Sequence, residues 1–419
     1  MDNINIKFTV DSDQLNKALK MVSIVSPQFI SQQERGFLFV VNGDTCSVYS
    51  KNSAHEARSS FPISDVEGSG SFMYPSDYIG VFEFISGPIM FTATSEGESF
   101  KVKYTFGTSG AVERVSFDPR TMISFESNIQ EAMSQAPKEF NIKILQLAFG
   151  MTKPFMAKAS DNVNYEFYKT IQIFGDDGDP ELAKKANGYV LTSNGTEACY
   201  FHSEAFLNKG LAAASQHLSL LESFMSQSSG AIHIYKTARG TYAVNANKDV
   251  VGWPHYEHSY KKFSYYVKTD QVVVKVPSKD MYHQLKLMRA GVPKDKSRIR
   301  LNFDSSNGNF WFSSIDEGSA ITSLPVPPKE VVEAKMGLAI NVNVNHMLHL
   351  FENLKGEWVE FRVMHLPPNA QRTKDSYMLR TIDEFVVSGE GAVIGGSGAE
   401  NVLEGTYICK VTRFTPGID

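Results

Sequence analysis

The feature that most constrains the fold is a pattern that occurs three times along the chain. Each copy opens with a strand that runs into an amphipathic helix, and continues with several strands, a second helix and further strands. The openings are NIKFTVDSDQLNKALKMV from Asn5, KEFNIKILQLAFGM from Lys138 and QVVVKVPSKDMYHQLKLM from Gln271. This recurrence predicts three α+β units of similar plan, built mainly of antiparallel strands and related by pseudo-symmetry.

The opening helices are predicted from apolar residues spaced along one helix face. In the first opening this face consists of Leu15, Ala18, Leu19 and Val22. Asp11 or Ser12 is a suitable N-cap because its side-chain oxygen can accept from the first free amides. In the third opening the face is Met281, Leu285 and Met288, with Ser278 as the expected cap.

A second helix is expected in the middle of each unit. The apolar residues that predict it are Tyr78, Val81, Phe82 and Ile85 after Ser76; Leu207, Leu211, Ala214, Leu218 and Leu221; and Met347, Leu350, Phe351 and Leu354 before Gly356. Alternating runs from Pro88, Gly230 and Glu357 predict strands and hairpins. The expected domains are residues 1–135, 136–268 and 269–419, and the Gly/Ser-rich stretch from Ser388 is expected to be a flexible loop.

Composition excludes several classes of protein. The chain has 419 residues, of which 42% are hydrophobic and 21% charged, so it should fold rather than stay disordered. No apolar run approaches the ~18 residues that a membrane span needs. The first residues show no signal-peptide pattern. Cys46, Cys199 and Cys409 form no CxxC pair, which argues against a disulfide framework or a cysteine zinc site and for a reducing compartment.

Catalytic motifs are weak everywhere in the sequence. There is no GxxxxGK[ST] loop and no GxSxG elbow, and the glycines at 395, 396 and 398 lack the flanking strand and lysine of a nucleotide site. The pairs His255/His258 and His346/His349 are spaced to share a metal, so a metal hydrolase is one hypothesis. Solvated histidines are the favoured interpretation, because neither pair has a nearby cysteine or an HExxH glutamate.

The positions of the lysines and arginines are more informative than the catalytic motifs. Lys+Arg number 41 against 46 Asp+Glu, a formal charge of −5, which argues against a general nucleic-acid coat. Any one lysine is best read as part of a solvated helix face. Recurrence of lysines on the opening helices, away from their apolar stripes, instead favours a shared basic surface that would attract phosphates locally.

Four fragments, in order along this three-unit chain, resemble the β sliding clamp of bacterial DNA polymerase III and its phage relatives. They are LTSNGTEACY (191–200), GWPHYEHSY (252–260), NVNVNHMLHLFENLKGEWVEFRV (from Asn341) and YICKVTRF (407–414). The resemblance implies three clamp domains per chain, each with two helices lining a central hole and antiparallel sheets outside. Two chains would close head to tail into a ring around duplex DNA, which is held by phosphate attraction without base readout.

The resemblance also implies particular site residues. The expected DNA-facing residues are Lys17, Lys20, Lys143, Tyr165, Lys209, Lys279, Lys286 and Arg289. The expected pocket for partner peptides comprises Phe167, Ser193, Gly195, Thr196, Ala198, Asn343, His346, Ile408, Cys409, Lys410, Val411, Thr412, Arg413 and Phe414. Tyr104 and Phe106, on a strand expected at a sheet edge, are the expected dimer contacts.

This chain departs from the family at several of these positions. Thr196 and Glu197 replace a His-Arg pair, Lys410 replaces a methionine, Val411 replaces a proline, and Thr415–Asp419 extend past the usual end. These changes put the peptide preference in doubt.

The resulting hypothesis is a cytoplasmic, homodimeric processivity factor without enzymatic activity or cofactor, in a bacterium or a phage-infected host. Its partners would be duplex DNA, the replicative polymerase, a clamp loader, partner peptides and a second copy, with no membrane. The alternative is a non-enzymatic viral structural or scaffold protein.

Overall fold

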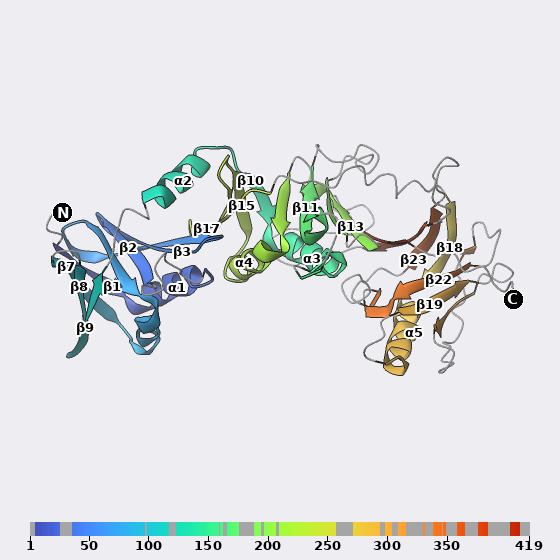
Figure 1. The fold of residues 1–419 in the computed structure, drawn as a ribbon, viewed down its shortest axis with the longest axis horizontal. Helices are drawn as coiled ribbons and strands as arrows, with labels where there is room; N and C mark the ends of the chain where they lie inside the picture. The colour runs from blue at the N-terminus through green and yellow to red at the C-terminus, as the bar shows by residue number, and fades with distance from the viewer. Residues whose placement is uncertain are drawn as a thin grey trace. The chain divides into compact units, whose positions relative to one another are not determined.

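The computed structural model divides into two compact units (Figure 1). Unit 1 is residues 1–142 and 216–256, and unit 2 is residues 143–215 and 257–419. The structure describes residues 5–25, 36–96, 99–116, 123–158, 160–161, 166–175, 188–193, 197–206, 209–256, 271–293, 298–303, 309–315, 330–331, 338–345, 347–348, 358–364, 376–383 and 403–410. Its described part contains no helix long and apolar enough to span a membrane.

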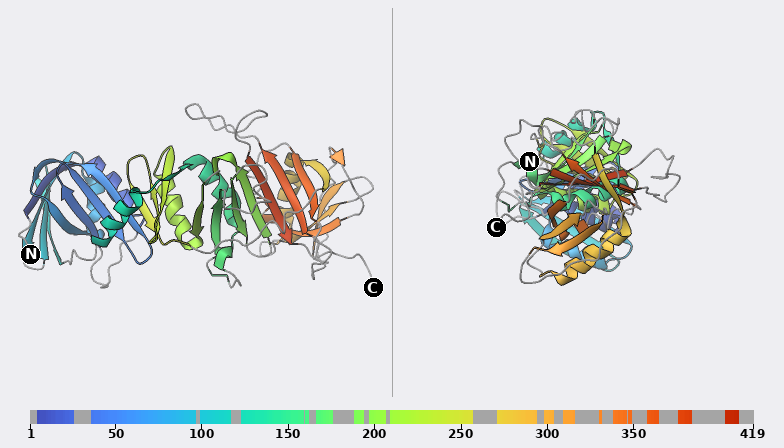
Figure 2. Two further views of the ribbon diagram at one scale, coloured as in Figure 1. Left: turned by 90° about the horizontal axis from the view of Figure 1, so that it is seen from above. Right: turned by 90° about the vertical axis from the view of Figure 1, so that its right-hand side faces the viewer.

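Unit 1 contains two antiparallel sheets. The smaller has the order β5-β1-β7-β8-β9, and the larger has the order β10-β15-β16-β17-β4-β3-β2-β6. Figures 1 and 2 show strands of both sheets as arrows. The strands are β1 (Asn5–Asp11), β2 (Gly36–Asn42), β3 (Thr45–Lys51), β4 (Glu56–Pro62), β5 (Ser64–Glu67), β6 (Gly70–Pro75), β7 (Pro88–Glu96), β8 (Ser99–Phe106), β9 (Ser109–Ser116), β10 (Lys138–Asn141), β15 (Ala231–Lys236), β16 (Thr241–Val244) and β17 (Val250–Trp253). The helices are α1 (Ser12–Val22), the 3-10 helix η1 (Ser76–Phe84), α2 (Ile123–Met133) and α4 (Ser215–Ser226).

Unit 2 contains a nine-stranded and a three-stranded sheet. Their orders are β14-β11-β12-β13-β25-β24-β23-β18-β21 and β20-β19-β22. The strands are β11 (Thr170–Phe174), β12 (Gly188–Ser193), β13 (Glu197–Ser203), β14 (Leu211–Ala214), β18 (Gln271–Pro277), β19 (Arg298–Phe303), β20 (Phe310–Ser314), β21 (Glu330–Val331), β22 (Leu338–Asn343), β23 (Trp358–Met364), β24 (Ser376–Asp383) and β25 (Leu403–Lys410). The helices are α3 (Ile142–Thr152), α5 (Ser278–Gly291) and the short 3-10 turns η3 (Lys153–Phe155), η4 (Glu166–Lys169) and η5 (Glu204–Phe206).

The opening helices form where the sequence predicts them. Asp11 is the N-cap of α1, since its Oδ1 accepts from the amides of Asp13 (2.9 Å) and Gln14 (3.4 Å). Ser12 is instead buried, and its hydroxyl accepts from the amide of Gly87. The predicted cap of α5 is wrong: Ser278 is its first helical residue, and Pro277 holds the cap position without a side-chain bond.

An aromatic cluster forms the core between the two sheets of unit 1. Phe91 on β7 is its centre, and its ring centroid lies 5.2 Å from that of Phe8, 5.6 Å from Phe82 and 6.0 Å from Phe39. All four side chains are fully buried. The alternating strands therefore supply the inward rings that hold the two layers together.

The second helices of the units differ most from prediction. Helix η1 is a 3-10 helix, so side chains three apart share a face. Its inner face is Ile79, Phe82 and the following Ile85. Its outer face, here named the η1 outer stripe, is Tyr78, Val81 and Phe84, which are 52%, 36% and 88% exposed. The expected α-helical stripe with Tyr78 and Val81 inside is wrong because the helical period here is three residues.

Two further helices differ from the prediction. Leu211 and Ala214 lie on strand β14, and helix α4 begins only at Ser215. Helix α2, which the sequence did not predict, ends just before the expected domain boundary at residue 135, with Ile129 and Ala132 buried. In the third expected domain the helical residues that the structure describes include Val344 and Met347, both fully buried. Leu350, Phe351, Leu354, Gly356 and the stretch from Ser388 to Asn401 lie outside the described residues.

Each large sheet combines strands from two expected domains. In unit 1, β17 of the second domain pairs with β4 of the first, and in unit 2, β25 of the third pairs with β13 of the second. We call these two strand pairings the first and second seams. The division into three domains remains a prediction, and the seams show how neighbouring domains would be joined.

Polar side chains cross the first seam. The Tyr242 hydroxyl donates to Glu56 Oε1 (3.0 Å), and Ser59 Oγ donates to Asp249 Oδ1. His217 on α4 places its Nδ1 2.8 Å from Nε2 of His55, which precedes β4. Burial lowers the pKa of both imidazoles, and that of His217 falls to about 4.

We expect unit 1 to lose stability as the pH falls. The unfolded chain binds protons on His55 and His217 near the ordinary pKa of 6.5, whereas the folded chain binds them only at lower pH. The free energy of unfolding should therefore decrease from about pH 6.5 downward. The measurement is urea unfolding at pH 7, 6 and 5, comparing the protein with a His55→Gln/His217→Gln variant. Because both proteins retain Glu56, the difference isolates the histidines; equal pH slopes would contradict the assignment.

Candidate nucleic-acid interface

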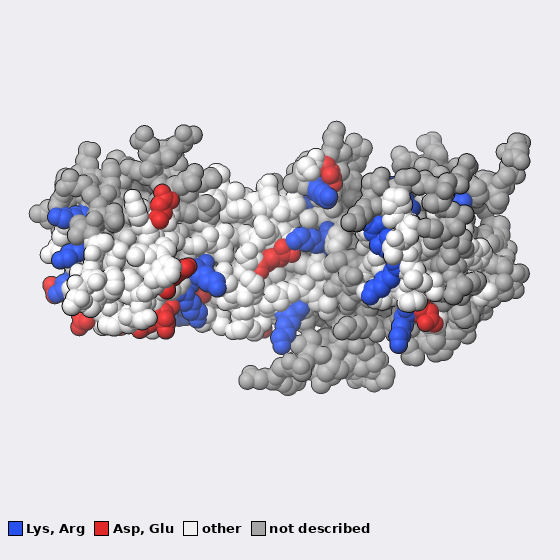
Figure 3. All heavy atoms as spheres, turned by 90° about the horizontal axis from the view of Figure 1, so that it is seen from below, with Lys and Arg blue, Asp and Glu red and all other residues white. Residues whose placement is uncertain are grey.

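Helix α1 places two of the predicted DNA-facing lysines in solvent. Leu15, Leu19 and Val22 are buried against the sheets, and Lys17 and Lys20 are exposed on the other side of the helix. Figure 3 shows Lys and Arg on the described surface of both units, with Asp and Glu beside them. On the face drawn there, the described basic side chains are therefore local groups rather than a coat.

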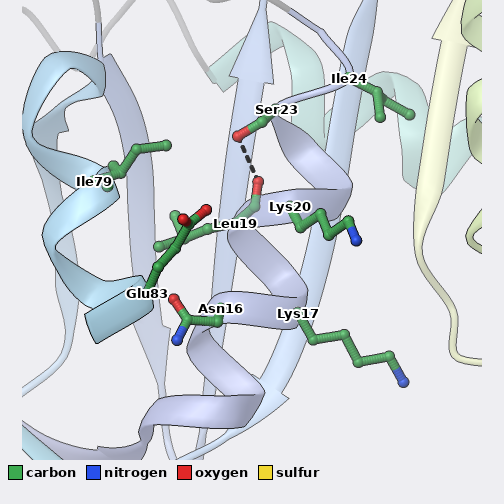
Figure 4. Close-up of a pocket in the computed structure, with 9 residues that line it drawn as sticks. Asn16, Lys17, Leu19, Lys20, Ser23, Ile24, Ile79 and Glu83 are labelled. Carbon is green, nitrogen blue, oxygen red and sulfur yellow. Dashed lines mark hydrogen bonds between the residues drawn. The ribbon is translucent and has the colours of Figure 1, made fainter. Parts of the chain in front are cut away.

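An open groove of about 660 Å³ runs between α1 and η1. Asn16 Nδ2 donates to the Phe82 carbonyl (2.8 Å), which ties the two helices together. Figure 4 shows Ile79 and Glu83 directed from η1 towards α1, while Lys17 and Lys20 extend from the far side of α1. The two lysines thus point away from η1, whereas Glu83, which is also exposed, points towards α1.

Helix α5 presents a second basic face. Met281, Leu285 and Met288 are buried as predicted. Lys279 and Lys286 are exposed, and Lys286 Nζ lies 4.3 Å from the centroid of the Tyr282 ring.

Arg289 is partly buried. Its Nη1 donates to the carbonyls of Val292 (3.5 Å) and Pro293 (3.3 Å). Arg289 therefore closes the C-terminus of α5, where a cation is favoured, and is less available to phosphates than the two lysines.

The remaining basic candidates belong to the second expected domain. Lys143 is exposed on α3, as predicted. Lys209 is not on a helix, which corrects the prediction; it lies just before β14 because the sequence there continues as a strand. Tyr165 lies outside the described residues.

The second seam brings together part of the predicted partner pocket. Ser193 on β12 is paired with Ala198 on β13, and Ala198 with Ile408 on β25. Cys409 is paired with Glu197, and Lys410 with Ser376 on β24.

The other predicted pocket residues are spread over unit 2 or are not described. Phe167 lies on η4 and is partly exposed, with its ring centroid 4.5 Å from that of Tyr168. Asn343 ends β22 in the three-stranded sheet. Gly195, Thr196, His346, Val411, Thr412, Arg413 and Phe414 lie outside the described residues.

The strand that the sequence predicts at a sheet edge lies inside the sheet. Strand β8, which carries Tyr104 and Phe106, lies between β7 and β9, so β9 is the edge of the sheet. Tyr104 is only 4% exposed, and its ring centroid lies 5.0 Å from that of Phe82. Alternation of apolar and polar residues does not distinguish an inner strand from an edge strand. It also does not predict the η1 outer stripe, whose side chains are spaced three residues apart.

The metal hypothesis gains no support from the geometry. Among the described residues no three His, Cys, Asp or Glu side chains are grouped to hold a metal. His255 is exposed, and His258, His346 and His349 lie outside the described part of the chain.

Comparison with solved structures is decisive for the architecture. A DNA polymerase sliding clamp from Pseudomonas aeruginosa superposes with a TM-score of 0.69 at 14% identity, covering 98% of this chain and 100% of that one. The chain has the fold of a bacterial DNA sliding clamp.

Two further clamps match over similar lengths. The β subunit of the Streptococcus pyogenes DNA polymerase gives a TM-score of 0.68 at 11% identity, with coverages of 97% and 100%. The C. crescentus β clamp, with polyethylene glycol at a proposed β-motif tethering region, gives 0.69 at 10%, with 98% and 100%. Neither protein-family models nor curated protein sequences give a match. The chain thus shares the clamp fold with these proteins at sequence identities of only 10–14%.

Proposed function

We propose that the protein is a DNA sliding clamp: a homodimeric ring that encircles duplex DNA and tethers the replicative polymerase. The observation that carries this proposal is the match of 98% and 97% of the chain to two clamps that are themselves fully covered. The exposed lysines of α1, α3 and α5 supply the chemistry, because a sliding ring needs phosphate attraction without a preferred register.

Processivity by encirclement needs no catalytic group. The protein would therefore act without enzymatic activity or cofactor, in the cytoplasm of a bacterium or a phage-infected host. A clamp loader would open the ring and place it on DNA. A scaffold protein would account for the many strands but not for a clamp fold over the full chain length.

The partner pocket would lie beside the second seam. Ser193, Ala198 and Ile408 lie across neighbouring strands there, so β13 and β25 would form one wall. A short peptide with apolar anchors is the ligand that such a groove accepts, and the polymerase and other replication proteins would present it.

We expect the protein to be retained on circular DNA and released when that DNA is cut. Light scattering across a dilution series should give 93.2 kDa, twice the 46.6 kDa chain. The purified protein, assembled on nicked plasmid with or without a bacterial clamp loader, should then co-elute with the plasmid in high salt. Linearisation should release it, since only the topological link survives salt. Equal retention on circular and linear DNA would refute encirclement.

A further inference from the structure

Helix α5 carries an aromatic ring beside one of its lysines. The Nζ atom of Lys286 lies 4.3 Å from the centroid of the Tyr282 ring. The two residues are four apart in the helix, so they are neighbours on its surface. Lys286 is exposed and Tyr282 is half-buried. A cation within about 6 Å of a ring centroid is attracted by the ring face, so Tyr282 restricts where the Lys286 ammonium lies.

An aromatic partner leaves the charge of a lysine intact, whereas a carboxylate does not. Lys7 is paired with Glu67, and Lys51 Nζ lies 3.7 Å from Glu56 Oε2, so in both pairs a negative charge offsets the ammonium. The Tyr282 ring has no net charge. Lys286 therefore keeps its full positive charge for an anion that arrives from solution.

The sequence of α5 also keeps acidic groups away from this lysine. Its neighbours on the helix surface, three and four residues away, are Tyr282, His283, Arg289 and Ala290. Asp280 is the one acidic residue of the helix, and it lies in the first turn, where the helix dipole favours a negative charge. Lys279 is exposed three residues before Tyr282, so the ring lies between two basic positions of the same helix.

We propose that Tyr282 is a positioning residue for DNA: its ring holds the Lys286 ammonium in one place on the surface of α5, ready for a backbone phosphate. The inference rests on the proposed clamp function and deepens it. A lysine has a flexible four-carbon stem, and ordering a side chain on binding opposes affinity. The ring reduces that cost because it orders the lysine beforehand. It acts on the lysine and reads no base, so the ring of protein still slides without a preferred register.

Tyr282→Leu and Tyr282→Phe test the proposal. Leucine removes the ring, whereas phenylalanine keeps the ring face and removes only the hydroxyl. We expect Tyr282→Leu to weaken affinity for a labelled duplex by about 2- to 5-fold for each chain of the dimer, and Tyr282→Phe to bind like the parent protein. Fluorescence anisotropy at low salt measures both affinities. Equal weakening by the two variants would overturn the proposal, because the hydroxyl and not the ring would then be responsible.

A second lysine variant shows whether Tyr282 acts through Lys286. Lys286→Met removes the ammonium and keeps most of the apolar stem. In that background Tyr282→Leu should cause no further loss of affinity, and a similar loss with and without the lysine would overturn the proposal. Tyr235→Leu is the matched control, since Tyr235 is a half-buried tyrosine on β15 and its loss should leave DNA affinity unchanged. Circular dichroism checks that each variant is folded.

Plasmid retention keeps this proposal separate from the clamp itself. Retention in high salt depends on the topological link, so Tyr282→Leu protein should remain on circular DNA as the parent does. Failure of the parent protein to be retained would refute the clamp. A retained parent, with unchanged duplex affinity in the folded Tyr282→Leu variant, would refute only the positioning role.

Discussion

Replacing Lys17, Lys20, Lys279 and Lys286 together with glutamate is expected to weaken DNA association strongly while leaving the protein folded. All four side chains are exposed, so their loss removes little packing beyond the contact of Lys286 with the Tyr282 ring. Each phosphate contact contributes about 0.9 to the magnitude of the slope of log affinity against log salt, so losing four should lower that magnitude by about 3.6 for each chain of the ring. Fluorescence anisotropy with a labelled duplex at 50 to 200 mM salt gives both the affinity and the slope.

The control for that experiment is a variant with the same change in charge on strands. Lys101, Lys103, Lys138 and Lys236 are also exposed, and they lie on β8, β10 and β15. Their replacement by glutamate should change DNA affinity much less, because only the long-range field is altered. Equal losses in the two variants would show that net charge, and not the opening helices, governs binding.

Phe91→Ala is expected to cost unit 1 about 3–5 kcal/mol of unfolding free energy. Phe91 is fully buried, and its ring lies within 6.5 Å, centroid to centroid, of the rings of Phe8, Phe39, Phe72, Phe82 and Tyr104. Truncation leaves a cavity at the centre of this cluster. Urea unfolding followed by circular dichroism measures the loss.

Phe84→Ala is the matched control, because it deletes the same ring at a position that is 88% exposed. Its effect on a monomeric sample should stay within about 0.5 kcal/mol. A small effect of Phe91→Ala would mean that the two sheets of unit 1 are not held together by these rings.

The sequence predicts the elements whose patterns are local. Asp11, with apolar residues at helical spacing behind it, is sufficient to place α1, and the strands from Pro88 and Gly230 form hairpins as expected. The prediction is wrong for η1 and α4 because Val81, Leu211 and Ala214 are compatible with two structures. Their spacing suits an α-helix, and it equally suits the 3-10 helix and the strand that they form. Only packing against α1 and β11 selects between these alternatives.

The candidate site could be predicted only in part. Exposure of Lys17, Lys20, Lys279 and Lys286 follows from the apolar stripes opposite them. Burial of Tyr104 does not follow from the sequence, because it depends on β9 extending the sheet beyond β8. The contact that helix α4 makes across the first seam could not be foreseen either, since His55 and His217 are 162 residues apart and nothing local links them.

The first seam has a consequence for how the protein is made. Ser59 and Asp249, which bond across it, are 190 residues apart in the chain. At ribosomal speeds of about 5–20 residues per second, β4 emerges roughly 10–40 s before β17. During that interval the nascent first domain carries an open strand edge that could pair with another nascent chain on the same messenger. Slower synthesis between residues 62 and 250 would lengthen this exposure, and so the yield of native protein should depend on translation rate.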